Sequence, residues 1–503
     1  MGEEAREKML KGINLAADAV KPTLGPMAKT VVLKENGKPI IVNDGVTVAR
    51  AIHHEDEFID MGAKLLIEVA TQAQNNAGDG TTTACVLAQA FCQEGMKQIE
   101  QGNNPVDVAN ALTNMVVKTK THLLTMVKPI NDAKEIENVA SIAANNDVFI
   151  GELIAQAVEK VGSNGVITVE ESKDMTTGIE KVQGMEIERG YRSHHLAVDK
   201  EKNITEMLNP LILISNFNII RFQELIPILE KVSESKRPLL LISRTLEQHA
   251  ISNLIVNVMG GVVQCCAIEC PDYGYVSDSI LEDIAILTNG KFLDYQANMK
   301  LEDVNIEDLG QAEKITVGEL KTLIVNGAGN KENIEERMNM IEGHLEDASN
   351  EYVMDNMKTR IAKLSGGIAV LHIGAASEIE MRDKKERVDD ALNATRAAME
   401  MGIISGGGTA LLQCSEIVDY DSLENGFKWC LVTPYNQILE NAGLAYTNKP
   451  INAKTGKECD MFEEGIIDPI KVTISSLESA ASVASLVLTS EVLVGEKNEN
   501  MHK

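Results

Sequence analysis

The residues best suited to chemistry lie in the stretch AGDGTTTACVLAQAF, residues 77–91. Two glycines flank Asp79, three threonines follow (Thr81, Thr82 and Thr83), and the chain then turns apolar, as at the start of a buried helix. A helix N-terminus carries unsatisfied N–H groups and a partial positive charge, which together attract phosphate. Glycine lets the backbone approach a ligand closely, and the threonines add hydroxyl donors. The stretch therefore predicts an anion site at a helix start.

Asp79 narrows the choice of ligand. A carboxylate beside a phosphate is unfavourable unless a cation lies between them, and Mg²⁺ prefers such oxygen ligands. The stretch therefore fits a cradle for a magnesium nucleotide. An ordinary helix N-cap fits it equally well, because Asp and Thr are both good capping residues. The pattern GxxxxGK[ST] does not occur in the sequence, which excludes a P-loop site.

Three further turns contain glycine and lie far apart in the chain. They are TLGPMAK at residues 23–29, VNDGVTVAR at residues 42–50 and IISGGGTALL at residues 403–412. The second of them puts Asp44 in a tight turn, and the third leads into a helix. Each turn alone is weak evidence, but four such elements from both ends of the chain would suit one nucleotide pocket.

The N-terminal part of the chain supplies the elements that would carry these turns. Residues 5–21 have apolar side chains at helical spacing, and the predicted helix ends before Pro22. Two short strands are predicted on either side of Asn36-Gly37, which is a hairpin signal. Long helical segments follow over residues 58–127, so the threonine-rich stretch opens one of them.

The middle of the chain changes character. Short β-rich runs alternate with helical runs, which is typical of an α/β domain. These runs are GVITVEES, PLILISN, RPLLLIS, GGVVQCCAIE and KTLIVNG. A long charged helical region covers residues 335–367, and from about residue 384 the chain is mainly helical again. Two helical ends around a mixed centre predict a discontinuous domain whose halves come together.

Composition limits the functions that the chain can have. Of 503 residues, 44% are hydrophobic and 3% aromatic, so the chain can bury sizeable aliphatic cores. A net charge of −28 argues against a nucleic-acid partner. The longest apolar run, ASLVLTSEVLV, is interrupted and too short to cross a bilayer, so no membrane association is expected. Eight cysteines without a visible secretory signal predict reduced thiols and a cytoplasmic location.

Several longer segments, in the same order, resemble the group I chaperonins, the bacterial GroEL-like family. The segments are TLGP, NDGVTVAR, AGDGTTTA, GVITVEES, RGY, EDLGQAEKI, RIAKLSGGIAVLHIGAASEIEM, RVDDALNATRAAMEMGIISGGG and IIDPIKVT. They span nearly the whole chain. The resemblance implies an ATPase that captures non-native polypeptides and encloses and refolds them in the cavity of a ring.

The same resemblance implies a multidomain α and α/β fold, the chaperonin fold. A mainly helical equatorial domain, a small α/β intermediate domain and an α/β apical domain are expected. Their ranges would be 1–125 and 401–503 for the equatorial domain, 126–182 and 369–400 for the intermediate domain, and 183–368 for the apical domain. The hinges between them would be Pro129 with Gly402, and Gly184 with Gly367.

By resemblance, the nucleotide would be ATP with Mg²⁺. The family's ATP pocket falls on Thr23, Leu24, Gly25, Pro26, Asp79, Gly80, Thr81, Thr82, Thr83, Gly407, Asn452, Ala453 and Asp468. Asp79 would ligate Mg²⁺, and Asp44 and Asp390 would position and activate the attacking water. Asn43 stands where the family has lysine, a departure that bears on binding of K⁺.

The resemblance also implies that the apical domain grips non-native polypeptides and a lid. The residues that match are Tyr191, Leu196, Ile226, Leu229, Ile251, Ile255 and Val256. For the five of these residues in the two helical segments FQELIPILEKV and HAISNLIVNVMGG, helical spacing alone would instead predict core stripes. His195 and Leu196 stand where the family has two aromatic residues, which would weaken gripping there or make it sensitive to pH.

The chain departs from the family in its equatorial parts. The family's N-terminal strand and its Gly-Gly-Met tail are missing, and LENAGLAYTNKPINAKTG is much shorter than the matching family segment, which supplies contacts between stacked rings. We therefore expect a homo-oligomeric ring, with seven subunits as in the family, that does not stack: a single ring.

Other readings of the sequence remain open. The resemblance does not decide whether a GroES-like co-chaperonin serves as a lid. A passive ring that holds unfolded proteins with little productive ATP turnover is the alternative function. A small-molecule kinase would need a substrate pocket with its own base, and the sequence offers no such constellation.

Overall fold

The computed structural model describes most of the chain. The described residues are 2–35, 38–42, 45–130, 132–162, 165–172, 176–200, 203–272, 274–297, 299–347, 351–375 and 377–495. Asn43 and Asp44 lie outside them, as do the two central residues of the predicted hairpin. The predictions for Asp44 and for K⁺ at Asn43 therefore have no structural description.

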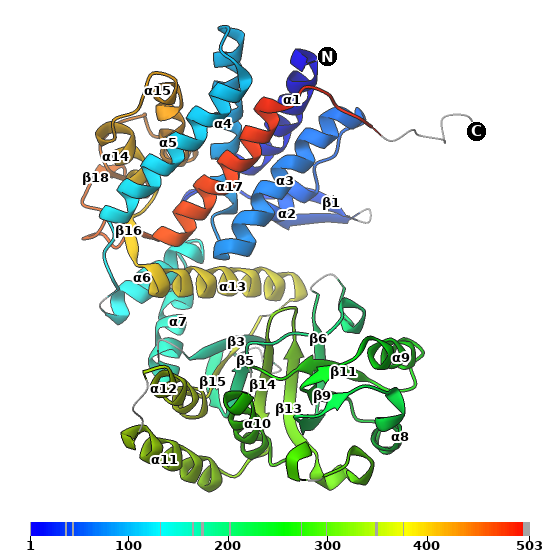
Figure 1. The fold of residues 1–503 in the computed structure, drawn as a ribbon. Coiled ribbons are helices and arrows are strands. Elements are labelled where there is room, and N and C mark those ends of the chain that lie inside the picture. The colour runs from blue at the N-terminus through cyan, green and yellow to red at the C-terminus, as the bar shows by residue number, and fades with distance from the viewer. Residues whose placement is uncertain are drawn as a thin grey trace. The chain divides into compact units, whose positions relative to one another are not determined.

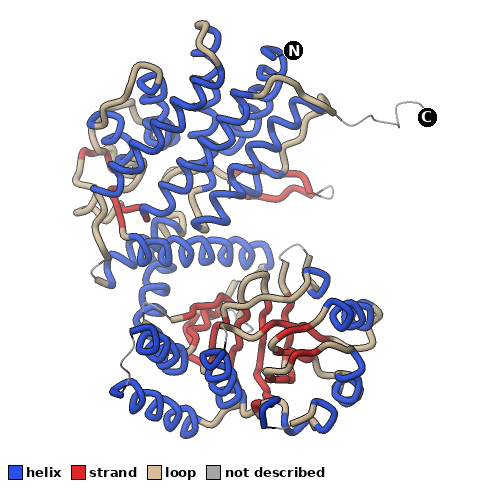
Figure 2. Tube along the Cα trace, viewed as in Figure 1, coloured by secondary structure: helices blue, strands red, loops and turns tan. Residues whose placement is uncertain are grey.

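The chain folds into two compact units (Figure 1). The first unit consists of residues 1–156 and 373–503 together with 173–175, and the second of residues 157–172 and 176–372. Helices dominate the first unit, whereas strands gather at the centre of the second with helices around them (Figure 2). The two ends of the chain thus join in one helical unit, and an α/β unit lies between them in sequence.

The first unit is built from long helices and short strand pairs. Its described elements are α1 (Gly2–Val20), β1 (Val31–Glu35), β2 (Lys38–Val42), α2 (Gly45–Arg50), α3 (Glu57–Ala77), α4 (Thr81–Glu100), α5 (Pro105–Thr125), α6 (Ala133–Ala143), α7 (Val148–Val161, which runs on into the second unit), α13 (Glu378–Met401), β16 (Ile403–Ser405), α14 (Thr409–Ile417), α15 (Glu424–Phe427), α16 (Thr433–Asn441), β17 (Ile451–Asn452), β18 (Lys457–Glu458), β19 (Ile467–Pro469) and α17 (Ile470–Thr489). The predicted first helix, the hairpin of β1 and β2 and the long helices of residues 58–127 are all present.

The core of this unit forms where α17 packs against α3, α4 and α5, and α1 packs against α3. The buried side chains are almost all aliphatic, with Phe91 and Phe427 as an edge-to-face aromatic pair. By length and composition α17 could cross a membrane, and it is longer than the apolar run recognised in the sequence, but 72% of its most apolar window is buried inside the protein. It is therefore a core helix. Trp429, the only tryptophan, lies just after α15 and is 69% exposed.

Helices α1 and α3 cross through two glycines. A Cβ placed on Gly12 would overlap the backbone around Ile59, and one placed on Gly62 would overlap the backbone carbonyl of Met9. The two backbones are therefore in contact at the crossing, and only glycine fits at either position.

The close crossing of α1 and α3 predicts that even a glycine-to-alanine substitution there lowers the stability of the protein. Gly62→Ala should lower the free energy of unfolding by about 1–3 kcal/mol, because the added methyl group forces the two backbones apart. Gly343→Ala is the matched control: this helical glycine has no atom within 4 Å of an added Cβ, so alanine should stabilise by roughly 0.5–1 kcal/mol. Chemical denaturation followed by circular dichroism measures both changes. An equal change in the free energy of unfolding of the two variants would contradict the close contact between the α1 and α3 backbones.

The second unit surrounds one large mixed sheet. Its described elements are β3 (Val166–Glu171), β4 (Gly178–Val182), β5 (Gly184–Ile187), β6 (Thr205–Leu208), β7 (Leu211–Ser215), β8 (Asn218–Ile219), α8 (Ile226–Ser235), β9 (Leu239–Ser243), β10 (Thr245–Leu246), α9 (Gln248–Met259), β11 (Cys265–Glu269), α10 (Gly274–Thr288), β12 (Phe292–Leu293), β13 (Gly310–Val317), β14 (Thr322–Gly327), α11 (Lys331–Asp347), α12 (Glu351–Gly366) and β15 (Ile368–Ile373). Each of the five predicted β-rich runs contains one of these strands.

The described strands of this unit form an eight-stranded sheet and smaller ones. The order in the large sheet is β11-β9-β7-β13-β14-β5, with β12 added on β7 and β6 on β13. Strands β11, β9, β7 and β12 are parallel, and β13 runs antiparallel to β7. Strands β3, β15 and β4 form a separate three-stranded sheet. The parallel strands are continuous apolar runs, as expected for strands buried on both faces.

The charged helical region of residues 335–367 contains two described helices, α11 and α12. They are anchored by a carboxylate on α10. Asp283 is fully buried and accepts hydrogen bonds from Arg337 of α11 at 2.7 Å and from Arg360 of α12 at 2.6 and 2.8 Å. Because a buried carboxylate needs such partners, this cluster fixes two helices whose sequences offer few apolar residues.

Candidate functional site

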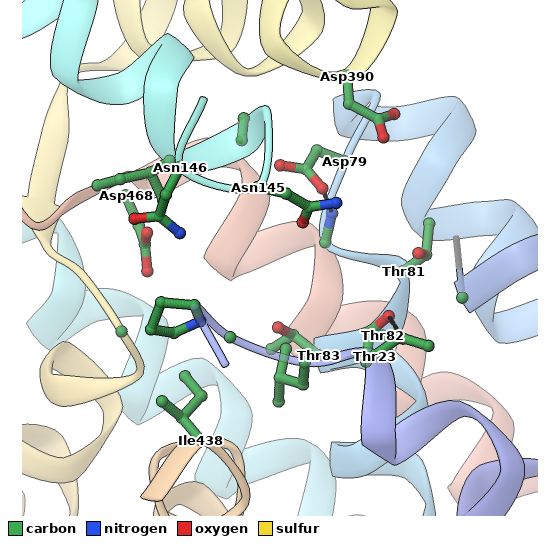
Figure 3. Close-up of a pocket in the computed structure, with 18 of the residues that line it drawn as sticks. Thr23, Asp79, Thr81, Thr82, Thr83, Asn145, Asn146, Asp390, Ile438 and Asp468 are labelled. Carbon is green, nitrogen blue, oxygen red and sulfur yellow. Dashed lines mark hydrogen bonds between the residues drawn. The ribbon is translucent and has the colours of Figure 1, made fainter. Parts of the chain in front are cut away.

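One cavity of about 1230 Å³ lies inside the first unit. It is lined by the turn after α1, the start of α4, the turn before α14, the β17–β18 hairpin, β19 and helix α13. All thirteen residues predicted to bind ATP line it, as does Asp390. These residues come from both ends of the chain, and the fold brings them to one place (Figure 3).

The loop around Asp79 is held between two glycines in left-handed conformation. Gly78 ends α3 at φ 74°, and Gly80 precedes α4 at φ 83°. A side chain at Gly80 would also collide with Ser476 and Val472 of α17. Both glycines are therefore required by the backbone. The loop closes on itself, because the Gly80 N–H donates to Asp79 Oδ1 at 2.5 Å.

The structure separates the two readings of the threonine-rich stretch. The N-cap of α4 is Gly80, and no side chain caps the helix. Asp79 and the threonines therefore do not serve as ordinary caps, and the first N–H groups of α4 have no capping side chain. That arrangement is what an anion site at a helix start requires.

The turn of residues 23–26 lies against this helix start. Thr23 Oγ1 donates to the carbonyl of Val20 at 2.8 Å and lies 3.3 Å from Thr82 Oγ1. The turn itself is held by Asn441, whose side-chain amide donates to the carbonyl groups of Lys21 and Leu24 at 2.9 and 2.8 Å. Two hydroxyl groups from distant segments thus meet at one wall of the cavity.

Asp468 stands at another wall. Strand β19 pairs with β16, and the backbone N–H groups of Gly407 and Gly408 donate to the Asp468 carboxylate. Burial raises the pKa of Asp468 to about 7, and the negative charge of Asp79 adds to the shift. Two carboxylates that repel each other across a polar cavity make a favourable place for a cation.

The β17–β18 hairpin supplies Asn452 and Ala453. Asn452 Oδ1 accepts from the backbone N–H of Lys454 at 3.0 Å, and its amide donates to Glu464 at 3.2 Å. The Asn452 side chain, which lines the cavity, is thus fixed by its own hairpin and by Glu464.

Asp390 reaches the cavity from α13. Val388, Leu392 and Thr395 are buried on one face of this helix. A small apolar cluster of Ala397, Ala77 of α3 and Val472 of α17 docks the helix within the unit. In Figure 3 the carboxylate groups of Asp390 and Asp79 lie on the same side of the cavity. Helix α13 therefore holds an acidic side chain next to the loop of Asp79.

Sequence reasoning missed Asn145 and Asn146, which also line the cavity. They form the turn between α6 and α7, with φ values of 57° and 63°. Asparagine tolerates this left-handed conformation better than most residues. The dipeptide Asn-Asn was therefore a signal for a special turn, although not for a place in the cavity.

The residues predicted to grip polypeptides lie in the second unit and differ in exposure. Val256 is 68% exposed and Ile226 37% exposed, whereas Tyr191 and Ile255 are partly buried. Leu196, Leu229 and Ile251 are 1%, 7% and 4% exposed, and they pack in the core of the unit. In this conformation those three side chains offer no surface to a partner, and for Leu229 and Ile251 the core-stripe reading expected this.

Two of the four predicted hinge residues, Gly367 and Gly402, have positive φ. Gly402 has φ 88° and Gly367 φ 65°. Lys128, next to Pro129, pairs with Ile403, next to Gly402, through hydrogen bonds of 2.9 and 2.8 Å. The two chain segments that contain Pro129 and Gly402 therefore lie side by side. Gly184 lies in β5, with the side chain of Ile368 packed against it.

Known proteins resemble the chain over almost its full length. A model of the TCP-1/cpn60 chaperonin family matches residues 16–498. Two crystal structures of the chaperonin gp146 from the bacteriophage EL 2 (Pseudomonas aeruginosa), both in the presence of ATP-BeFx, have a similar fold with 22% sequence identity over 99% of each chain. The TM-scores are 0.71 for crystal form II and 0.64 for crystal form I.

Proposed function

Because the chain belongs to the TCP-1/cpn60 chaperonin family, we propose that it is an ATP-dependent chaperone that captures non-native polypeptides and refolds them in the cavity of a ring. One observation carries the proposal. A single cavity in the helical unit collects threonine hydroxyls, a helix start without a capping side chain, and the carboxylates of Asp79, Asp390 and Asp468. That combination suits a magnesium nucleotide.

The residues present fit ATP and Mg²⁺. The glycine turns leave room for backbone to approach phosphate, and the repulsion between Asp79 and Asp468 would be relieved by a cation. Asp79 would hold the metal, and the threonines and the start of α4 would bind the phosphates. When bound, Mg²⁺ would neutralise charge on the phosphates during transfer.

Asp390 and Asp44 would act on the attacking water. Phosphoryl transfer to water needs an oriented nucleophile more than covalent chemistry. Asp390 can supply that orientation from α13, because its carboxylate lies on the side of the cavity where Asp79 lies. The role of Asp44 is proposed from the sequence alone, and so is any effect of Asn43 on K⁺.

The assembly and domain division are proposed on the same basis. We take the equatorial, intermediate and apical ranges predicted above, with hinges at the four named residues, and a single ring of seven subunits with or without a GroES-like lid. The short segment LENAGLAYTNKPINAKTG supports the single ring. Electron micrographs of the purified particle distinguish one ring from two.

The proposed function is tested by refolding. With Mg²⁺ and ATP, the purified protein should raise the yield of a chemically denatured client enzyme and hydrolyse ATP while doing so. Capture of the client without hydrolysis or recovery would favour the passive ring instead. If the protein neither captured the client nor hydrolysed ATP, both functions would be contradicted.

Client capture should depend on exposed apolar residues of α9. Val256 and Met259 are 68% and 69% exposed there. Replacing both by serine should lower affinity for a denatured polypeptide at least about tenfold, because each apolar side chain contributes roughly 1.5–3 kcal/mol when buried. Met340→Ser, at an exposed position of α11, is the control and should change little. A co-sedimentation assay without nucleotide measures both, and equal losses would contradict a gripping surface on α9.

A further inference from the structure

A lysine and an aromatic ring are in close contact in the helical unit. Lys128, which follows α5, has its ammonium nitrogen 3.5 Å from the centroid of the Phe462 ring. The other cation–π contacts among the described residues have separations of 5.2, 5.6 and 6.0 Å. Within the described ranges no carboxylate pairs with Lys128. The contact is attractive because the face of an aromatic ring carries negative charge density.

Both partners are held in place by their backbones. The Lys128 N–H donates to the carbonyl of Ile403 at 2.9 Å, and the Ile403 N–H donates to the carbonyl of Lys128 at 2.8 Å. Phe462 lies in the turn between β18 and β19. There Asp460 Oδ1 accepts from the backbone N–H groups of Phe462 and Glu463 at 2.8 and 3.2 Å. The contact therefore joins two fixed segments that lie far apart in the chain.

The turn that carries Phe462 also forms part of the cavity wall. Met461, Glu464 and Gly465 line the cavity, and Glu464 accepts a hydrogen bond from the Asn452 amide at 3.2 Å. Gly465 has φ 69°, and an added Cβ there would overlap the side chain of Asn138 on α6. The turn is therefore packed closely against α6 as well as against the cavity.

The Phe462 ring packs against a small apolar cluster that includes two alanines of α13. The members of the cluster are Val139 of α6, Ala394 and Ala398 of α13, Ile403 of β16 and Ile467 of β19. Ala394 lies about one helical turn after Asp390 on α13. The ring that faces the Lys128 cation thus belongs to the packing that fixes the part of α13 carrying Asp390.

We propose that Lys128 and Phe462 are positioning residues for hydrolysis, an inference that rests on the ATPase activity proposed above. Their contact holds the layer of α6 and α13 against the cavity turn, and so holds the Asp390 carboxylate where it can orient the attacking water. Neither Lys128 nor Phe462 is among the described residues that line the cavity. The pair therefore acts through α13 and not on the nucleotide itself.

Substitutions on each side of the contact test this role. Lys128→Gln removes the cation, and Phe462→Leu removes the ring but keeps an apolar side chain. Each should lower the rate of hydrolysis at saturating ATP about two- to fivefold, the size expected for a partly exposed cation–π contact. The double variant should lose no more than either single variant. Lys128→Arg and Phe462→Tyr keep a cation and a ring, so they should keep the wild-type rate.

Two measurements separate the rate from binding. Steady-state hydrolysis gives the rate at saturating ATP, and calorimetric titration with a non-hydrolysable ATP analogue and Mg²⁺ gives the affinity, which should stay unchanged. Lys428→Gln is the matched control: its ammonium nitrogen lies 6.0 Å from the centroid of the Trp429 ring, and neither residue is among the described residues that line the cavity. This variant should keep both the rate and the affinity.

The outcomes distinguish a positioning role from a purely structural one. If the contact only stabilised the fold, Lys128→Gln would lower the melting temperature but hydrolyse ATP at the wild-type rate well below it, and the inference would be overturned. Additive losses in the double variant, or an equal loss of rate and affinity, would also overturn it while leaving the proposed function intact. A wild-type protein that hydrolyses no ATP would overturn both.

Discussion

Replacing Asp390 by alanine should lower the rate of ATP hydrolysis by about 10²–10⁴-fold while ATP still binds. That range is typical for the loss of a side chain that positions or deprotonates a nucleophile. Binding should persist because the threonines, the start of α4 and the glycine turns belong to other elements. Single-turnover hydrolysis and equilibrium binding of ATP give the two quantities separately.

The neighbouring residue provides the control for this variant. Asp389 is on the same helix and exposed, so Asp389→Ala changes net charge and helix content in the same way without touching the cavity. Its hydrolysis rate should stay within about twofold of the wild type, as for most surface substitutions. If Asp390→Ala hydrolysed ATP as fast as Asp389→Ala, the proposed role of α13 in the reaction would be refuted.

Replacing Asp79 by asparagine should abolish the dependence of hydrolysis on magnesium and lower its rate by about 10³-fold. Asparagine has the shape of aspartate and its oxygen can still accept from the Gly80 N–H, so the loop keeps its hydrogen bond. What is lost is the negative charge that a hard cation requires. Titration of the rate with MgCl₂ measures the effect.

A carboxylate elsewhere in the same cavity tests whether charge alone is responsible. Glu137 lines the cavity but forms an exposed ion pair with Lys134 at 2.5 Å. Glu137→Gln should therefore leave the magnesium dependence unchanged, because exposed pairs of this kind contribute little. The same loss in both variants would argue against a metal at Asp79.

Much of the cavity could be predicted because its parts have strong local signals. Gly25, Gly78, Gly80, Gly407 and Gly408 all have positive φ, and the sequence shows each of them in a turn next to a helix. The resemblance to chaperonins added which turns share one pocket, and the fold brings those turns together. Periodicity alone could not have done so, since the segments lie hundreds of residues apart.

Other features depend on tertiary packing and could not be predicted from the sequence. Leu229 and Ile251 have the helical spacing of a gripping surface and of a core stripe alike, and only the packed structure places them, with Leu196, in the core. Likewise, a capping role for Asp79 was as reasonable as a ligand role until Gly80 proved to be the N-cap.

The position of Trp429 gives this protein a built-in optical reporter. The chain has no other tryptophan, and this one is in the helical unit and exposed to solvent. An isolated subunit should therefore emit as a hydrated indole does, and melting should alter that spectrum little. A blue shift of the emission on mixing with nucleotide or at higher protein concentration would mean that a neighbouring surface has covered the indole ring. Tryptophan emission would not report on changes in the α/β unit, because that unit contains no tryptophan.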